Sequence, residues 1–146
     1  MATALAPIRW GRIALAGALA PILSFVLVTL IVAVYAFVLA FQARGQPDTA
    51  HINEFAARVA PWATPVLTAL LTLLGAMWVA RAVPSRAQLH GLFVGVVAAL
   101  LSLLLSLLGA RGVEFTTLLA CAAVVVAGWV GGLIAARAVR TPANPV

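Results

Sequence analysis

Three side chains that can bind metal ions recur every three residues in the first loop of the chain: Asp48, His51 and Glu54. On a helix this spacing brings them to one side, where carboxylate and imidazole groups could hold a divalent cation. The same spacing is typical of the solvated face of a surface helix, and we favour that interpretation. No metal site is therefore expected.

Hydroxyl side chains form a second group. Thr64, Thr68 and Thr72 follow one another at four-residue spacing, and Ser102 and Ser106 repeat this spacing later in the chain. Residues four apart share one face of a helix. In lipid such hydroxyls bond to their own helix or to a neighbouring helix. The alternative is an oligomeric conduit or permease, in which the five hydroxyls line a path for a small solute.

The remaining reactive groups are isolated in the sequence. Cys121 is the single cysteine, with no His or carboxylate near it, and is expected to be a small packing residue. His90 stands at the start of an apolar stretch, so we expect it at a membrane interface, with a pH sensor as the alternative. Ser24 and Ser106 have no base close to them that would make either one a nucleophile, so neither an enzyme nor a cofactor is predicted.

These groups are few because most of the chain is apolar. Of its 146 residues, 65% are hydrophobic and 8% are charged, and the mean hydropathy is +1.18. A soluble domain is about half apolar and about a quarter charged, so the sequence predicts an integral membrane protein. The formal net charge of +6 would suit a nucleic-acid-binding protein, but the arginines stand at the ends of apolar stretches, which membrane orientation explains without nucleic acid.

Four uncharged stretches define the predicted membrane spans. Each holds at least about 20 residues, the length that a helix needs to cross a bilayer core of about 30 Å. None alternates apolar and polar residues as a barrel strand does. The expected fold is an all-α integral membrane protein with four transmembrane helices in an antiparallel bundle, forming one domain over residues 1–146. The predicted spans cover residues 13–42, 61–80, 91–110 and 115–136.

The first predicted span is longer than a bilayer requires. It exceeds the others by roughly ten residues, so we expect this helix to tilt or to project into the outer interface. A cleaved signal peptide is the alternative explanation for its charged beginning. The apolar residues continue without interruption to Phe41, however, which favours an uncleaved span.

The arginine distribution predicts the orientation of the chain. Both termini and the second loop carry six arginines and no acid, whereas the acids Asp48, Glu54 and Glu114 balance the arginines of the other two loops. We expect the arginine-rich side in the cytoplasm, with anionic lipid headgroups as its partners. The lack of lysine indicates a GC-rich bacterial genome, and hence the bacterial inner membrane. The six arginines are Arg9, Arg12, Arg81, Arg86, Arg137 and Arg140.

The first loop also predicts a short amphipathic helix on the outer surface. Asp48 follows a Gly and Pro break and could cap this helix, and apolar residues recur at spacings of three and four from Ile52 to Val59. Pro61 and Pro65 would then open the second span in its first turn, where proline is tolerated.

Small residues at four-residue spacing predict tight packing of the last three spans. The sequence ends of the second and fourth spans share the letters ARAV, which two duplicated hairpins would explain; the high frequency of Ala, Val and Arg would explain it as well. Because no span contains an internal ionisable residue, we expect the protein to act through helix contacts with itself or with a partner membrane protein. The expected packing residues are Thr64, Thr68, Thr72, Ala76, Gly91, Gly95, Ser102, Ser106, Gly128 and Gly132.

Overall fold

The computed structural model describes residues 9–46, 48–83, 86–108 and 114–140. These residues form four helices and no strand, which confirms the all-helical class. Each helix is long and apolar enough to cross a membrane. The helices are α1 (Trp10–Ala43), α2 (Thr49–Arg81), α3 (Ala87–Leu108) and α4 (Phe115–Arg140).

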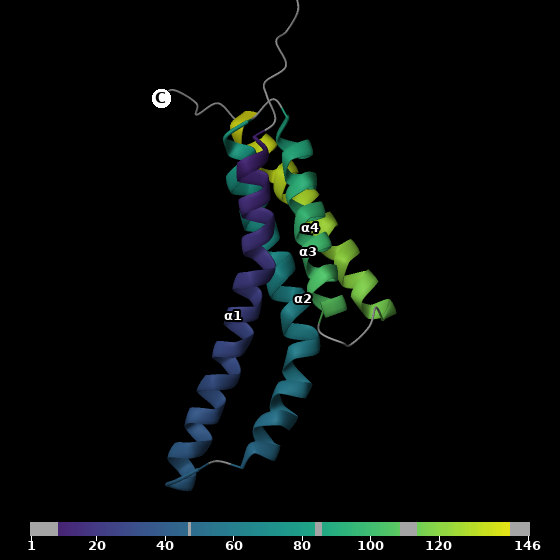
Figure 1. Cartoon of the computed structure of the whole chain (residues 1–146). Helices are drawn as coiled ribbons and strands as arrows, with labels where there is room; N and C mark the ends of the chain where they lie inside the picture. The colour runs from purple at the N-terminus through teal and green to yellow at the C-terminus, as the bar shows by residue number, and fades with distance from the viewer. Residues whose placement is uncertain (1–8, 47, 84–85, 109–113, 141–146) are drawn as a thin grey trace, which may run out of the picture.

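The four helices are arranged around α2 and α3. The start of α1, the end of α2, the start of α3 and the end of α4 lie at one end of the molecule, at the top of Figure 1. We call this the arginine end, and the opposite end, where α1 turns into α2, the hairpin end. α2 contacts the other three helices, and α3 and α4 share the most extensive contact. Within the described residues, α1 and α4 do not touch.

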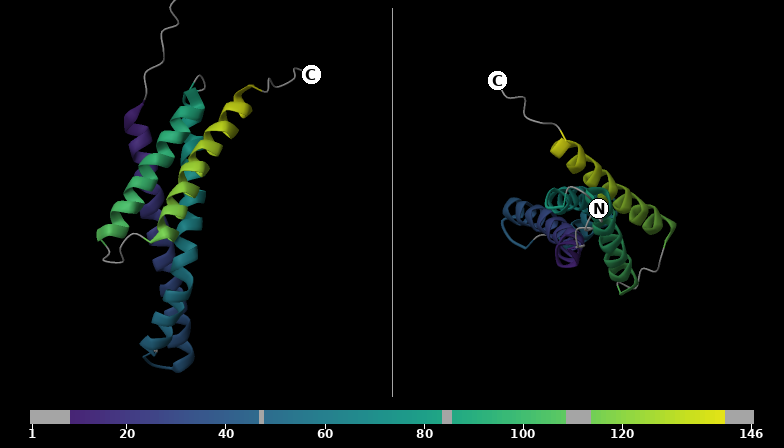
Figure 2. Two further views of the ribbon diagram at one scale, coloured as in Figure 1. Left: turned by 90° about the vertical axis from the view of Figure 1, so that its right-hand side faces the viewer. Right: turned by 90° about the horizontal axis from the view of Figure 1, so that it is seen from above.

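The two helical hairpins differ in length. α1 and α2 have 34 and 33 residues, whereas α3 and α4 have 22 and 26. At 1.5 Å per residue, α1 is about 51 Å long and α3 about 33 Å. Figures 1 and 2 show the first hairpin extending beyond the second at the hairpin end. There the Tyr35 ring stacks on Phe55, with ring centroids 3.9 Å apart, so the projecting segments of α1 and α2 stay paired.

The second helix differs from the sequence-based expectation. α2 is continuous from Thr49 to Arg81, so one long helix replaces the short surface helix and separate span that the sequence predicts. Pro61 and Pro65 lie inside it. Each proline removes one main-chain hydrogen bond, and α1 supports α2 between them. The Ser24 Oγ of α1 donates a hydrogen bond to the Thr64 carbonyl at 2.9 Å.

Glycines bring α3 and α4 to backbone contact. An ideal Cβ built on Gly91 would lie 2.5 Å from the carbonyl oxygen of Gly128, and one on Gly128 would lie 2.6 Å from the carbonyl oxygen of Gly91. One turn away on each helix, Gly95 and Gly132 are also crowded by main-chain atoms of the facing helix, at 2.9 Å and 2.7 Å from an ideal Cβ. Any side chain at these positions would push the two helices apart, so the four-residue glycine spacing fixes this crossing.

Asp48 caps the start of α2. Its Oδ1 accepts a hydrogen bond from the Ala50 amide at 2.9 Å, and its Oδ2 lies 3.2 Å from Nδ1 of His51. The backbone hydrogen bond, and after it the hydrogen bond to His51, lower the pKa of Asp48. Both bonds favour the charged carboxylate, as is usual at a helix N-terminus.

We expect the first turn of α2 to lose protection from hydrogen exchange at acid pH. A carboxyl whose pKa is depressed in the folded state stabilises the fold above its unfolded pKa, and this contribution is lost as the pH falls through the folded pKa. Exchange of the Ala50 amide is the measurement. Asp48→Asn is the control, because asparagine also caps helices but does not titrate. The same acid dependence in both proteins would contradict this role for Asp48.

Candidate functional site

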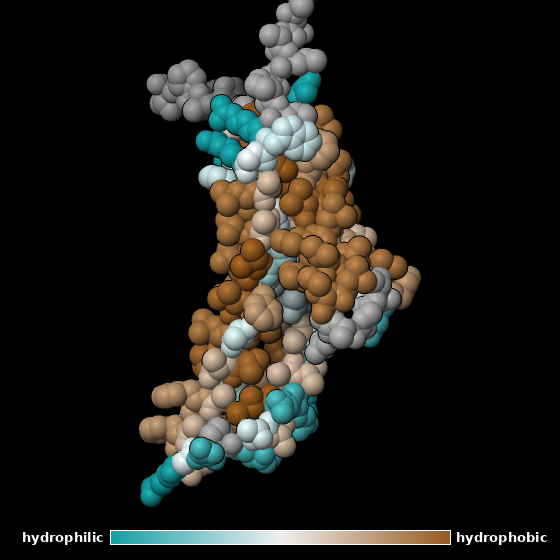
Figure 3. All heavy atoms as spheres, in the orientation of Figure 1, coloured by the Kyte–Doolittle hydropathy of each residue, from teal (hydrophilic) through white to brown (hydrophobic). Residues whose placement is uncertain are grey.

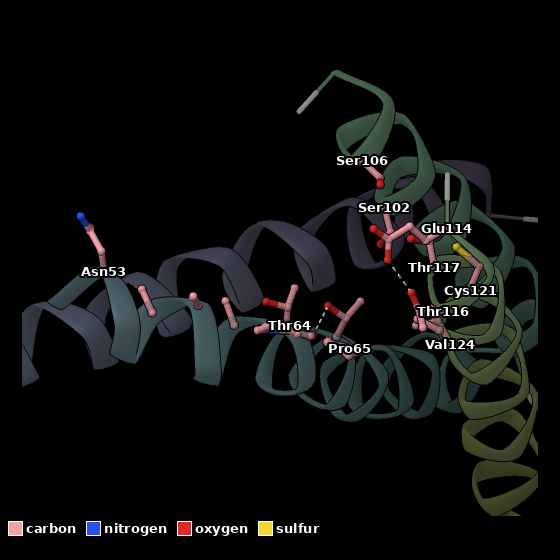
Figure 4. Close-up of a pocket in the computed structure, with 16 residues that line it drawn as sticks. Asn53, Thr64, Pro65, Ser102, Ser106, Glu114, Thr116, Thr117, Cys121 and Val124 are labelled. Carbon is pink, nitrogen blue, oxygen red and sulfur yellow. Dashed lines mark hydrogen bonds between the residues drawn. The ribbon is translucent and has the colours of Figure 1, made fainter. Parts of the chain in front are cut away.

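A groove of about 890 Å³ lies between α2 and the facing ends of α3 and α4 (Figure 4). We call it the hydroxyl groove. Its α2 wall runs from Asn53 to Thr68, a length of about 22 Å at the helical rise. Ser102 and Ser106 of α3 form one part of the opposite wall. Residues between Glu114, which precedes α4, and Val124 of α4 form the other part.

The sequence forms this groove by placing only small or short side chains along one face of α2. Every residue of the α2 wall is Ala, Pro, Thr or Asn, and Ala56, Ala60, Thr64 and Thr68 repeat at four-residue spacing. Residues at this spacing lie above one another on a helix. The continuity of α2 through its two prolines extends the small-residue face toward the hairpin end, beyond the predicted span.

Two hydroxyl groups of the groove, one on α2 and one on α3, donate their protons to carbonyls of their own helices. The Thr68 Oγ1 donates to the Thr64 carbonyl at 2.8 Å, and the Ser102 Oγ donates to the Ala98 carbonyl at 2.8 Å. A hydroxyl oxygen that donates in this way still has lone pairs that accept hydrogen bonds. These walls therefore offer acceptors to a guest.

A carboxylate lies at the rim of the groove, where the chain enters α4. Glu114 precedes α4, and its Oε2 accepts a hydrogen bond from the Thr116 hydroxyl at 3.2 Å, as the dashed line in Figure 4 shows. The Glu114 side chain is exposed. It adds negative charge to a lining that already favours hydrogen-bond donors.

Four of the five hydroxyl residues that the sequence groups together line this groove: Thr64, Thr68, Ser102 and Ser106. The fifth, Thr72, does not. Its side chain is fully buried, and its Oγ1 has no hydrogen-bond partner. α4 meets α2 at this level, since a Cβ on Gly131 would lie 2.6 Å from the Leu73 carbonyl oxygen. Thr72 therefore lies in the core of the bundle and not in the hydroxyl groove.

His90 is buried among the helices. It lies in the first turn of α3, near the arginine end where an interfacial position was predicted, and only 1% of its surface is exposed. Its Nδ1 is 3.0 Å from the Arg86 carbonyl, whereas Nε2 is buried without a partner. Val94, one turn further, is fully buried as well. His90 shares this buried face because Gly91 turns the adjacent face of α3 onto α4.

The acids and histidine of the first loop form two separate local pairs. Asp48 pairs with His51, and Glu54 accepts a hydrogen bond from Arg58 at 2.8 Å. All four side chains are exposed at the hairpin end. The arrangement is that of a solvated surface held by short-range pairs.

Sequence reasoning missed several groove residues. Cys121, predicted to be a small packing residue, packs against the buried Ala99 and Val124, and it also lies on the α4 wall of the groove, where its Sγ donates to the Ala99 carbonyl oxygen at 3.6 Å. Asn53 and Glu114 stand in predicted loops and gave no signal of their own. The spacing of Ala56, Ala60 and Thr64 across Pro61 was a usable signal, had α2 been extended through the proline.

The six predicted headgroup arginines all stand at helix ends. Arg9 and Arg12 lie at the start of α1, Arg81 ends α2, Arg86 precedes α3, and Arg137 and Arg140 lie in the last turn of α4. Figure 3 shows hydrophilic residues at both ends of the molecule and a broad hydrophobic band between them. The Arg12 guanidinium lies over the Trp78 ring, with Cζ 5.7 Å from the ring centroid.

No protein-family model, curated protein or solved structure matches this chain. A four-helix arrangement by itself does not specify an activity. The hydroxyl groove and the arginine end are thus the features from which a function has to be inferred.

Proposed function

We propose that this chain is an accessory protein of the bacterial inner membrane that binds a transmembrane helix of another polypeptide in the hydroxyl groove. The observation that carries the proposal is the wall of small side chains along four turns of α2. Helices in lipid associate through close packing of small residues. A trough about 22 Å long suits a helix better than a compact solute.

The proposed orientation places the arginine end in the cytoplasm, with four antiparallel helices crossing the bilayer. The hydrophobic band in Figure 3 supports this placement, as does the gathering of six arginines at one end. Trp10 and Trp78 lie at the arginine end and Trp62 lies toward the other. Tryptophans near both interfaces are typical of membrane proteins.

The chemistry of the groove indicates what the bound helix should carry. Thr68 and Ser102 offer hydrogen-bond acceptors, because their protons are already engaged. We therefore expect small residues and side-chain donors on the occupant. A basic or amide side chain level with Glu114 would complete the match, since an ionised carboxylate only accepts hydrogen bonds.

Site-specific photo-crosslinking in native membranes tests this proposal. A benzophenone amino acid at Ala57 or Ala120, both in the groove, is expected to give protein adducts. Matched positions at Leu100 and Val126, which are exposed on α3 and α4, should give none. The mass of the adduct distinguishes a second copy of this chain from a different protein. Equal adducts at groove and control positions, or none at either, would contradict the proposal.

Filling the groove supplies a second arm of the same test. Ala60→Leu adds a large side chain to the α2 wall and should abolish the adduct formed from Ala120. Ala33→Leu adds the same side chain at an exposed position of α1 and should leave the adduct unchanged. An adduct that survives Ala60→Leu would mean that the partner helix lies elsewhere.

One observation favours a second candidate, a conduit for a small solute bearing hydrogen-bond donors. Four predicted lining hydroxyls do share one cavity. Toward the arginine end, however, Gly95 packs against the main chain of Val124 and Val125, so a path through one chain would need this contact to open. Flux in proteoliposomes that falls with Thr68→Val, but not with the α1 control Thr29→Val, would favour the conduit; flux equal to empty liposomes would exclude it.

A further inference from the structure

A second, smaller groove lies between α1 and α2 near the arginine end, away from the hydroxyl groove. It has a volume of about 260 Å³, and its lining is almost entirely apolar. α1 contributes Leu19 and Leu23, and α2 contributes Leu71 and Leu74. Gly75 forms the floor of this groove, and an ideal Cβ built on it would lie 3.4 Å from Cβ of Ala16. A glycine here therefore leaves a furrow that a larger residue would fill.

A cation stands where this furrow meets the arginine end. Trp78 closes the groove, and the Arg12 guanidinium lies over its ring at 5.7 Å. Arg9, which precedes α1, and Arg81, the last residue of α2, each lie three residues from one of this pair in the sequence, and both are exposed. The acidic side chains of the sequence, Asp48, Glu54 and Glu114, belong to the first and third loops, so among the residues that the structure describes no carboxylate side chain neutralises this corner.

We infer that this furrow is a binding site for an anionic phospholipid. One acyl chain lies along the leucines between α1 and α2, and the headgroup phosphate is held by Arg12 beside Trp78. The inference rests on the membrane insertion proposed above, but not on the hydroxyl groove. It commits to a lipid because the furrow is apolar and ends at an unneutralised guanidinium. A transmembrane helix of a second copy fits less well, because the predicted spans of this chain carry no acidic residue that could pair with Arg12.

The physical match has two parts. A guanidinium is planar and can donate two parallel hydrogen bonds to a phosphate, which a single point charge cannot do. Its position on the Trp78 ring limits its rotation. Tryptophan is also the side chain typical of the membrane interface, which is the depth at which a phosphate lies above its acyl chain.

Native mass spectrometry of the purified full chain, titrated with phosphatidylglycerol or with phosphatidylcholine of the same acyl chains, tests the site. We expect tighter binding of phosphatidylglycerol. Arg12→Gln should weaken it about fivefold, the factor that corresponds to one arginine's attraction for an anionic headgroup. Arg137→Gln removes the same charge at the same end, on α4, and should change binding less than twofold.

The apolar part of the site has its own variant. Gly75→Leu fills the furrow and should weaken phosphatidylglycerol binding at least fivefold, whereas Ala14→Leu, at an exposed position of α1, should not. Arg12→Gln changes an exposed side chain and its contact with the Trp78 ring but leaves the packed helix faces intact, so it decides the question if Gly75→Leu does not fold. Equal loss in Arg12→Gln and Arg137→Gln, equal affinity for both lipids, or competition by glycerol 3-phosphate without acyl chains would each overturn the assignment. So would a dimer that Gly75→Leu disrupts in the absence of lipid adducts.

Discussion

Gly128→Leu is expected to separate α4 from α3 and to produce the largest loss of stability of any single substitution proposed here. The Cβ alone would lie 2.6 Å from the Gly91 carbonyl oxygen and 2.8 Å from Cα of Gly95. Overpacking a filled core costs about 1–3 kcal/mol, and main-chain atoms cannot rotate away as a flexible side chain can. We expect about 2 kcal/mol for Gly128→Ala and more than about 3 kcal/mol for Gly128→Leu.

The free energy of unfolding, measured by detergent-induced unfolding of the reconstituted protein, checks this result. Gly11→Ala is the matched control, because an ideal Cβ there meets no atom within 4 Å. Because alanine has the higher helix propensity, Gly11→Ala should raise the free energy of unfolding by up to about 1 kcal/mol. If the two glycines respond alike to alanine, the close α3–α4 crossing does not exist.

Ile13→Ala is expected to give the second-largest effect, a loss of about 2 kcal/mol. Ile13 is fully buried and packs with Ala16, Ala76, Val79 and Val94, from three different helices. In water, part of such a cost comes from returning the side chain to solvent. In a membrane the separated helices remain in lipid, so the cavity and the lost packing contacts dominate, and the value falls at the lower end of the usual range.

The control for this second prediction is Leu15→Ala, two residues further along α1. Leu15 is 53% exposed and lies on the outer surface of the bundle. Its truncation should change the free energy of unfolding by less than about 0.5 kcal/mol. Equal losses from Ile13→Ala and Leu15→Ala would mean that α1 is rotated about its axis relative to the position described.

The helices themselves were predictable from the positions of charged residues. An apolar stretch of about 20 residues between two charged residues is expected to form a membrane-spanning helix. The glycine crossing was also predictable in kind, because Gly91 and Gly95 repeat at four-residue spacing and so do Gly128 and Gly132. Which helix each glycine pair faces required the three-dimensional arrangement.

The features that sequence reasoning missed depend on contacts between distant segments. Pro61 normally indicates the start of a helix. In this structure α2 continues through it, and the Ser24 hydroxyl of α1 donates a hydrogen bond to the nearby Thr64 carbonyl. Thr72 has the same chemistry and spacing as Thr68, and only the approach of α4 assigns one to the core and the other to the groove. The sequence places His90 at a helix start, but only the packing of α3 against its neighbours shows that the side chain is 1% exposed.

The unequal hairpins give the molecule two apolar heights. α1 exposes Phe37 and Phe41 beyond the level at which α3 ends. A bilayer of uniform thickness cannot match the apolar length of both sides. Each Å of mismatch between the apolar length of a helix and the bilayer thickness costs a fraction of a kcal/mol. In a bilayer this protein should therefore sit at a local step, with thicker lipid beside the apolar face of α1 and thinner lipid beside the second hairpin, because α2 carries the exposed polar residues His51, Glu54 and Arg58 at the hairpin end. Neighbouring proteins with short spans would then gather preferentially on the side of the second hairpin.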